Sequence, residues 1–366
     1  MKEYNMNVWE KLSEQGLVEG EKPEMVVRTP WYIKILLSIS GWLGSLFLVV
    51  FIGGIIGLVL NDNIEDFPLL LTIVGGGIIF FTYNMFQEQR GDFFEHFLLG
   101  LSLAGQGLVI VSVFFILTRN STFFSMFDKD VLLPIYLFSA LFQAFLMWVM
   151  PNYIHRVMSS FFMVVALSGF FIIINEPFII NTLLTFVVTW LWLNEFTVRN
   201  HARVEAITYG LTAALVFLIY SLFSFSYYIY ESINFENKIY FSLYIVELST
   251  FAIFVYVIWN LFVKGKKLNS KRGFLLLITL LVFAYLSIKI GGLIFALILI
   301  LIGFAHKHNL LTALGIFSAF AFLSTYYYYT GETLMDKSIL LALMGVGIFL
   351  GRFMMKIVLE KEVSDV

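Results

Sequence analysis

Hydrophobic residues in this chain are gathered into long runs that short polar segments separate, and no run alternates polar with apolar positions. A helix needs roughly 17–25 residues to cross about 30 Å of hydrocarbon, and an open sheet cannot satisfy its backbone groups in lipid. The pattern therefore predicts an all-α, polytopic integral membrane protein with about twelve transmembrane helices. The predicted spans cover residues 34–60, 67–86, 95–117, 131–150, 155–174, 177–194, 204–227, 240–263, 273–288, 291–305, 309–328 and 337–358.

The segments between the predicted spans are short. The longest, 118–130 and 228–239, have about a dozen residues each, so we expect no soluble domain between the spans. Only the sequence KIGG separates the two shortest spans, 273–288 and 291–305. We interpret this segment as a tight hairpin around Lys289 rather than as part of one very long helix.

The composition agrees with a membrane environment. Of 366 residues, 60% are hydrophobic and 13% are charged, and the mean hydropathy is +0.89, whereas soluble domains have about 45–50% apolar and about 25% charged residues. We expect the lipid bilayer as the main partner. Because the net charge is only −2, nucleic acid is not expected. The absence of cysteine excludes disulfides and thiolate chemistry. The polar first 24 residues lack the apolar segment of a cleavable signal peptide.

The distribution of basic residues predicts the topology, because cytoplasmic loops of membrane proteins collect Lys and Arg. With twelve alternating spans, 18 of the 23 basic residues fall on the side that holds both termini, and five fall on the other side. This predicts an N-in, C-in, multi-pass protein of the cell inner (plasma) membrane. We divide it into a cytoplasmic N-terminal segment (1–32), a transmembrane helical domain (33–358) and a cytoplasmic tail (359–366).

Two polar side chains fall well inside predicted spans and form a candidate intramembrane site. They are Glu247 in FSLYIVELSTF and Gln106 in LSLAGQGLVIV. An ionisable group at that depth is costly, so it faces a cavity, pairs or stays protonated. Glu247 is therefore either a proton or cation site or a neutral acid that locks two helices together. Gln106 either ties helices together through its amide or binds a ligand, and the flanking Gly105 and Gly107 let another backbone approach closely.

A polar corner at the end of the eleventh predicted span is a candidate outer-face binding site. Its members are Tyr326, Tyr327, Tyr328, Tyr329, Glu332, Asp336 and Lys337. Tyrosine rings settle at headgroup depth, but consecutive helical residues point about 100° apart, so at least one ring must point into the bundle. Asp336 is expected to cap the last span. Lys337 either snorkels to lipid phosphate or pairs with an acidic group.

The sequence contains no motif that predicts a reaction, a metal or a cofactor. HExxH, GxSxG and Walker loops are absent from the sequence, so an enzyme is the less favoured class and no catalytic residue is predicted. Five histidines are scattered through the chain without metal-ligand spacing, and we expect them to be solvated at the cytoplasmic interface. These residues are His96, His155, His201, His306 and His308.

Several stretches together resemble one family of bacterial multi-spanning membrane proteins with a domain of unknown function. They are TPWYIKILLSISGWLGSLFLV, LLGLSLAGQGL, GGLIFALILILIGFAHKHNLLTALG, and the tyrosine run with TLMDKS and Arg352. Genes of this family tend to lie beside one for a small membrane-anchored protein with a GDYxxLxY motif. The family pattern prefers a proline in the KIGG turn, where this chain has none. The resemblance implies an inner-membrane location and such a partner, and it supplies no catalytic residues.

Two functional hypotheses of different classes follow. In the first, the protein is a subunit of a membrane complex whose outer face binds the GDYxxLxY-type protein. In the second, it is a transporter or a lipid-handling permease that uses Glu247 within the bundle. An intramembrane enzyme is a third and weaker alternative.

Overall fold

The computed structural model describes residues 13, 30–59, 67–88, 91–119, 128–174, 176–197, 200–230, 236–263, 290–329 and 331–364. Within these residues the regular elements are all helices, and no strand is present. The helices are α2 (Trp31–Val59), α3 (Phe67–Met85), α4 (Asp92–Thr118), α5 (Lys129–Val149), α6 (Tyr153–Ile173), α7 (Pro177–Leu193), the 3-10 turn η3 (Glu195–Thr197), α8 (His201–Tyr230), α9 (Glu236–Ile258) with the π-helical turn η4 (Trp259–Val263), α11 (Leu293–Ala305), α12 (Asn309–Tyr329) and α13 (Leu334–Ser364).

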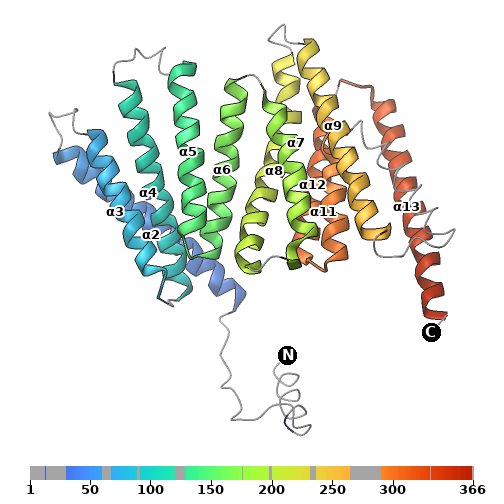
Figure 1. Ribbon diagram of the computed structural model, residues 1–366, viewed down its shortest axis with the longest axis horizontal. Coiled ribbons are helices and arrows are strands. Elements are labelled where there is room, and N and C mark those ends of the chain that lie inside the picture. The colour runs from blue at the N-terminus through green and yellow to red at the C-terminus, as the bar shows by residue number, and fades with distance from the viewer. Residues whose placement is uncertain are drawn as a thin grey trace.

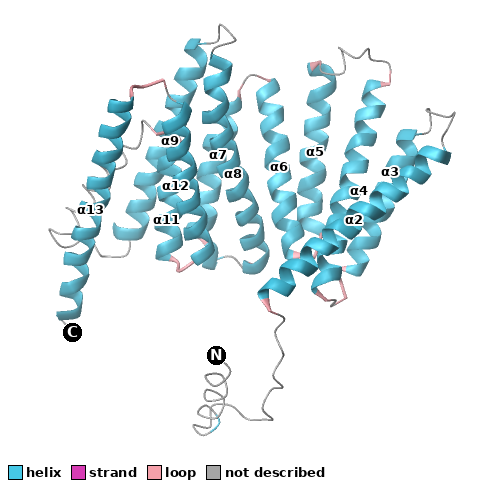
Figure 2. Ribbon diagram, turned by 180° about the vertical axis from the view of Figure 1, so that it is seen from behind, coloured by secondary structure: helices cyan, strands magenta, loops and turns pink. Residues whose placement is uncertain are grey.

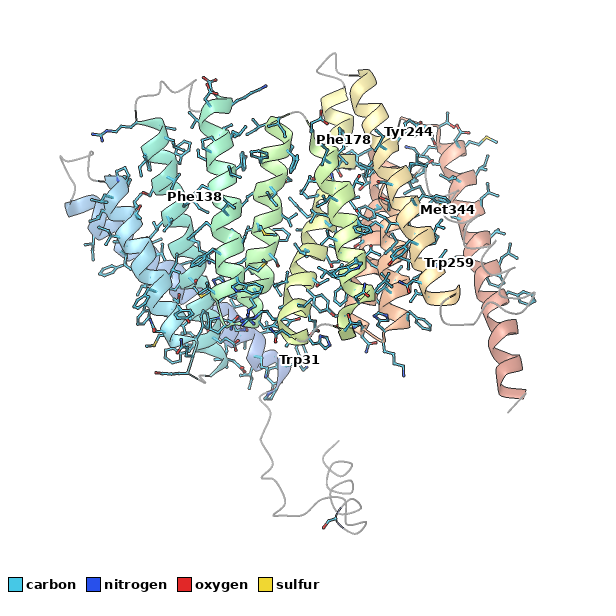
Figure 3. The ribbon with its side chains drawn as sticks, in the orientation of Figure 1. Trp31, Phe138, Phe178, Tyr244, Trp259 and Met344 are labelled. Atoms are coloured by element: carbon cyan, nitrogen blue, oxygen red, sulfur yellow. The ribbon has the colours of Figure 1, made fainter. Side chains whose placement is uncertain are left out.

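The helices stand side by side in a broad row, from α2 and α3 at one edge to α13 at the other (Figure 1). Seen from behind, α2 crosses obliquely over α4, with which it packs (Figure 2). The start of α2 at Trp31 and the end of α13 both lie at the lower end in these views (Figure 3). We refer below to the lower and upper ends of the bundle as they stand in Figure 1.

The surface of the row is apolar enough for lipid. Eight described helices are long and hydrophobic enough to cross a membrane, and Phe178–Leu193 and Leu293–Ala305 are shorter apolar helices. Large rings such as Phe47, Phe317 and Phe349 are more than 70% exposed, and side chains project outward along the whole row (Figure 3). Soluble proteins rarely expose so much apolar surface, because its contact with water is unfavourable. The protein is therefore membrane-embedded.

Most predicted spans correspond to helices, with two differences. The ninth predicted span, 273–288, and Lys289 lie outside the described residues. The tenth span, predicted over 291–305, is a helix of only 13 residues, because Ile290–Gly292 forms a turn before it. This turn is buried, with Ile290 fully inaccessible, so it lies within the bundle.

The main hydrophobic core surrounds this short helix. Ile294, Phe295, Ile298 and Leu299 of α11 have no exposed surface, and they pack in one cluster with buried residues of α6, α7, α8, α9 and α12. A helix that is apolar on all sides is typical of a protein core or of a membrane span, and other helices cover this one. The half of the bundle that contains α11 is therefore several helices thick.

In the other half, glycines set the closest approach between helices. A Cβ on Gly75 of α3 would lie 2.7 Å from the backbone oxygen of Gly105 in α4, and a Cβ on Gly105 would lie 2.9 Å from that of Gly75. Small residues allow such backbone contact between membrane helices. This contact matches the role predicted for Gly105, whereas a Cβ on Gly107 would meet nothing within 4 Å.

Candidate functional site

Glu247 lies in the middle of α9, and only 5% of the residue is exposed. Its Oε1 accepts a hydrogen bond of 2.8 Å from the backbone N–H of Gly292. Its Oε2 is buried and has no hydrogen-bond partner among the described residues. Gly292 has φ 83°, which disfavours any side chain, and a Cβ there would also collide with Ile219. Glycine is thus required where the backbone turns to meet the carboxyl group.

The contact with Glu247 lies at the N-terminus of α11, inside the bundle. At 1.5 Å per residue, the 13 residues of α11 span about 20 Å and the 21 residues of α12 about 32 Å. The two helices share one tight turn at the lower end. The upper tip of α11 therefore lies about 12 Å short of the end of α12. Because a helix N-terminus carries partial positive charge, Glu247 interacts favourably with the end of a short helix that begins inside the bundle.

Gln106 occupies the centre of a second buried polar group, which connects α4, α5 and α6. Its Oε1 accepts a hydrogen bond from Gln143 Nε2 at 2.9 Å, and its Nε2 lies 2.9 Å from His155 Nε2. Ser102 Oγ lies 3.0 Å from the same His155 nitrogen, and Ser159 Oγ lies 3.2 Å from Nδ1. An amide nitrogen only donates, so His155 Nε2 accepts and the ring carries its proton on Nδ1. Both ends of the Gln106 amide thus bind protein groups.

The prediction that all histidines are solvated is wrong for His155, which has no exposed surface. The backbone N–H of His155 donates a hydrogen bond of 2.9 Å to Oδ1 of Asn152, which caps α6, and Asn152 Nδ2 donates to Glu95 Oε1 at 2.7 Å. The N-terminus of α6 therefore turns the imidazole inward against α4. In the sequence, His155 stands at the end of a span beside Arg156, which is also where a solvated histidine would stand.

The tyrosine run and its polar neighbours Glu332, Asp336 and Lys337, called the tyrosine corner below, lie at the upper end of the bundle (Figure 1). As predicted, the tyrosine rings divide into buried and exposed ones. Tyr326 is buried, with 4% exposed, and its hydroxyl donates to Glu332 Oε2 at 2.7 Å. Tyr327 and Tyr328 are 41% and 77% exposed, and their rings meet edge to face. The four consecutive tyrosines thus divide between the bundle and its surface.

Lys337 is buried at this corner, with 6% exposed. Its Nζ donates to the backbone oxygen of Tyr327 at 2.9 Å and lies 5.9 Å from the centre of the Tyr327 ring. The cap of α13 differs from the prediction. Thr333 Oγ1 accepts from the N–H of Asp336 and donates to its Oδ2, so Thr333 caps the helix and Asp336 stands in its first turn.

The structure also brings together a polar group that the sequence analysis missed, which we call the lower-end cluster. It consists of Glu195, Glu205, His201, His306 and His308. Glu195 is 2% exposed, and its Oε2 lies 2.8 Å from His308 Nε2 and 4.0 Å from His306 Nδ1. Its Oε1 lies 3.4 Å from His201 Nε2. Ligand atoms of Glu195, Glu205 and His308 all lie within 4.8 Å of one another.

Local backbone structure explains how two of these histidines converge. Lys307 has φ 61° at the end of α11, where the N–H of His308 bonds Gly303 O at 2.8 Å and that of Lys307 bonds Phe304 O at 3.3 Å. This is the Schellman pattern of a helix C-terminus. It ends α11 in a tight turn, and α12 begins directly after it at Asn309. Burial lowers the pKa of His306 below its ordinary value, while Glu195 opposes the shift.

The three predicted sites are separate from one another. Glu247 belongs to α9, Gln106 to α4 in the other half of the row, and the tyrosine corner to the upper ends of α12 and α13. A signal for the lower-end cluster exists in the sequence, because the predicted topology places Glu195 and the HKH triplet on the same side. The contact between them, which joins residues 113 positions apart, has no local signal.

Comparison with known proteins agrees with the resemblance seen in the sequence. No curated protein and no solved structure matches the chain. A family model, described as Domain of unknown function (DUF4401), matches residues 30–358. Since this match includes all the described transmembrane helices and most of the chain, the protein is a membrane-embedded member of the DUF4401 family.

Proposed function

We propose that the protein is a membrane transporter in which Glu247 is the group that binds a proton or a cation. The observation that carries this proposal is the contact between Glu247 Oε1 and the N–H of Gly292 at the N-terminus of α11, which begins inside the bundle. Discontinuous helices with ends at membrane depth form the ion and substrate sites of many transporters. A buried carboxylic acid within the bilayer has a functional role by default.

The second carboxyl oxygen of Glu247, Oε2, is the atom that would bind the proton or the cation. Oε1 is held by the backbone, while Oε2 is buried and has no hydrogen-bond partner among the described residues. Leaving a buried acceptor unsatisfied costs about 1–3 kcal/mol. A proton that Oε2 shares with a substrate group, or a bound cation, would remove that cost. The site can therefore alternate between a loaded and an unloaded state.

Water access to position 247 tests this proposal. The chain contains no cysteine, so Glu247→Cys can be probed alone with a small, charged thiol reagent, which reacts with the thiolate and needs water. Leu248→Cys is the matched control, because Leu248 is the next residue of α9 and is 68% exposed on the apolar surface. We expect labelling of the first variant and none of the second. If neither reacts in proteoliposomes, the interior is dry and the transport proposal is wrong.

A second candidate function is the membrane-complex subunit, which the tyrosine corner favours. Tyr328 is 77% exposed beside the buried cation of Lys337 and the Tyr326–Glu332 hydrogen bond, and exposed tyrosine rings are common in protein interfaces. The expected partner is the small GDYxxLxY-type protein. Lys337→Met combined with Tyr328→Phe should abolish its co-purification from native membranes. Unchanged recovery of the bound proteins and lipids would leave the corner as an interfacial belt only.

A further inference from the structure

The lower-end cluster contains a buried carboxylate, that of Glu195, which faces imidazole rings. Among the described residues, the basic groups within 4.0 Å of Glu195 are His201, His306 and His308. An imidazole is positive only when it is protonated. A buried carboxylate with no permanent cation beside it is costly. These groups can therefore hold bound protons or a bound cation.

The donor atoms have the chemistry and the spacing of a metal site. Glu195, Glu205 and His308 supply two carboxylates and one imidazole from three segments, with ligand atoms within 4.8 Å of one another. Around a tetrahedral Zn²⁺, donors at about 2.0–2.2 Å lie about 3.3 Å apart. The observed separation of 2.8 Å between Glu195 Oε2 and His308 Nε2 is close to this value. Small side-chain rotations would place three donors on one ion.

His306 lies beside these three donors. Its Nδ1 faces Glu195 Oε2 at 4.0 Å, and the ring is hydrogen-bonded to the backbone of Trp192. A backbone partner of this kind fixes the ring orientation of metal-bound histidines. The two histidine side chains are 16% and 19% exposed, whereas Glu195 is 2% exposed. The site thus has a buried anchor and a side through which an ion can enter.

We propose that Glu195, Glu205 and His308, with His306 beside them, bind a divalent transition-metal ion of the Zn²⁺ class at the lower end of the bundle. Mixed imidazole and carboxylate ligands suit Zn²⁺, Co²⁺ and Ni²⁺ better than Mg²⁺ or Ca²⁺, which prefer oxygen ligands alone. The ion would join the α7–α8 connection to the α11–α12 turn. This site is independent of Glu247 and of the transport proposal.

Metal titration of the purified full-length protein tests the site. After treatment with a chelator, the protein in detergent is titrated with Co²⁺ and Zn²⁺, and the absorption of Co²⁺ reports its coordination. We expect one ion per chain, a tetrahedral Co²⁺ spectrum that Zn²⁺ abolishes, and no competition from Mg²⁺. Glu195→Gln and His308→Asn should each weaken binding by at least the roughly 10–100-fold that the loss of an outer-shell partner causes.

The matched control is His96→Asn, which removes a histidine of α4 that lies outside the cluster. It should bind Co²⁺ as the unmodified protein does. If Glu195→Gln or His308→Asn does not fold, Glu205→Gln changes a more accessible ligand and should give the same loss. Absence of stoichiometric binding by the unmodified protein would overturn the proposal, and so would equal binding by the ligand variants and His96→Asn.

Discussion

Replacing Gly105 with alanine tests the crossing of α3 and α4 directly. The added Cβ would lie 2.9 Å from the backbone oxygen of Gly75, and the side chains of Ile78 and Ile79 would be 3.0 and 3.1 Å away. Ordinary contact begins near 3.4 Å, so the two backbones must separate by about 0.5 Å. Neither backbone can move without disturbing its own helix. Overpacking of this kind costs about 1–3 kcal/mol.

Gly107→Ala is the matched control for this prediction, because Gly107 lies two residues further along α4 and a Cβ there would meet nothing within 4 Å. Both substitutions gain the same preference of alanine over glycine in a helix, about 0.5–1 kcal/mol, so that gain cancels in the comparison. We expect Gly105→Ala to be less stable than Gly107→Ala by about 1–3 kcal/mol. Reversible unfolding in mixed micelles, followed by circular dichroism, measures the difference. Equal unfolding midpoints would refute the close crossing.

Two further predictions concern the buried amides and the topology. Gln106→Leu should destabilise the protein by about 1–3 kcal/mol, because it leaves the Gln143 amide unpaired. Gln143→Leu should cost about 1 kcal/mol or less, because it also removes Gln143 Oε1, a buried acceptor with no hydrogen-bond partner among the described residues. A larger loss of stability for Gln143→Leu in the same unfolding assay would contradict the network. Ser270→Cys and Asn234→Cys, both at positions outside the described residues, should react with an impermeant thiol reagent from opposite sides of the membrane, and labelling of both from outside would contradict the N-in, C-in topology.

The sequence was sufficient to predict most of the helices that the structure describes, because each membrane helix satisfies its own backbone groups and its apolar length is a local property. The same reasoning placed Glu247 inside a span and required one tyrosine of the run to point inward, which Tyr326 does. It also assigned Gly105 and Gly107 to close helix contacts, of which Gly105 makes one and Gly107 does not. These predictions depend on residues that are neighbours in the chain.

Tertiary structure decided which polar groups meet. Glu247 contacts Gly292, 45 residues away, because α11 stops inside the bundle, and no feature of either residue alone indicates that end. Glu195 and His308 each look like ordinary interfacial residues until two helix connections place them 2.8 Å apart. In a bilayer, apolar helices gain little from choosing one apolar neighbour over another. Their arrangement therefore depends on close packing and on buried polar contacts between distant segments, which only the folded structure contains.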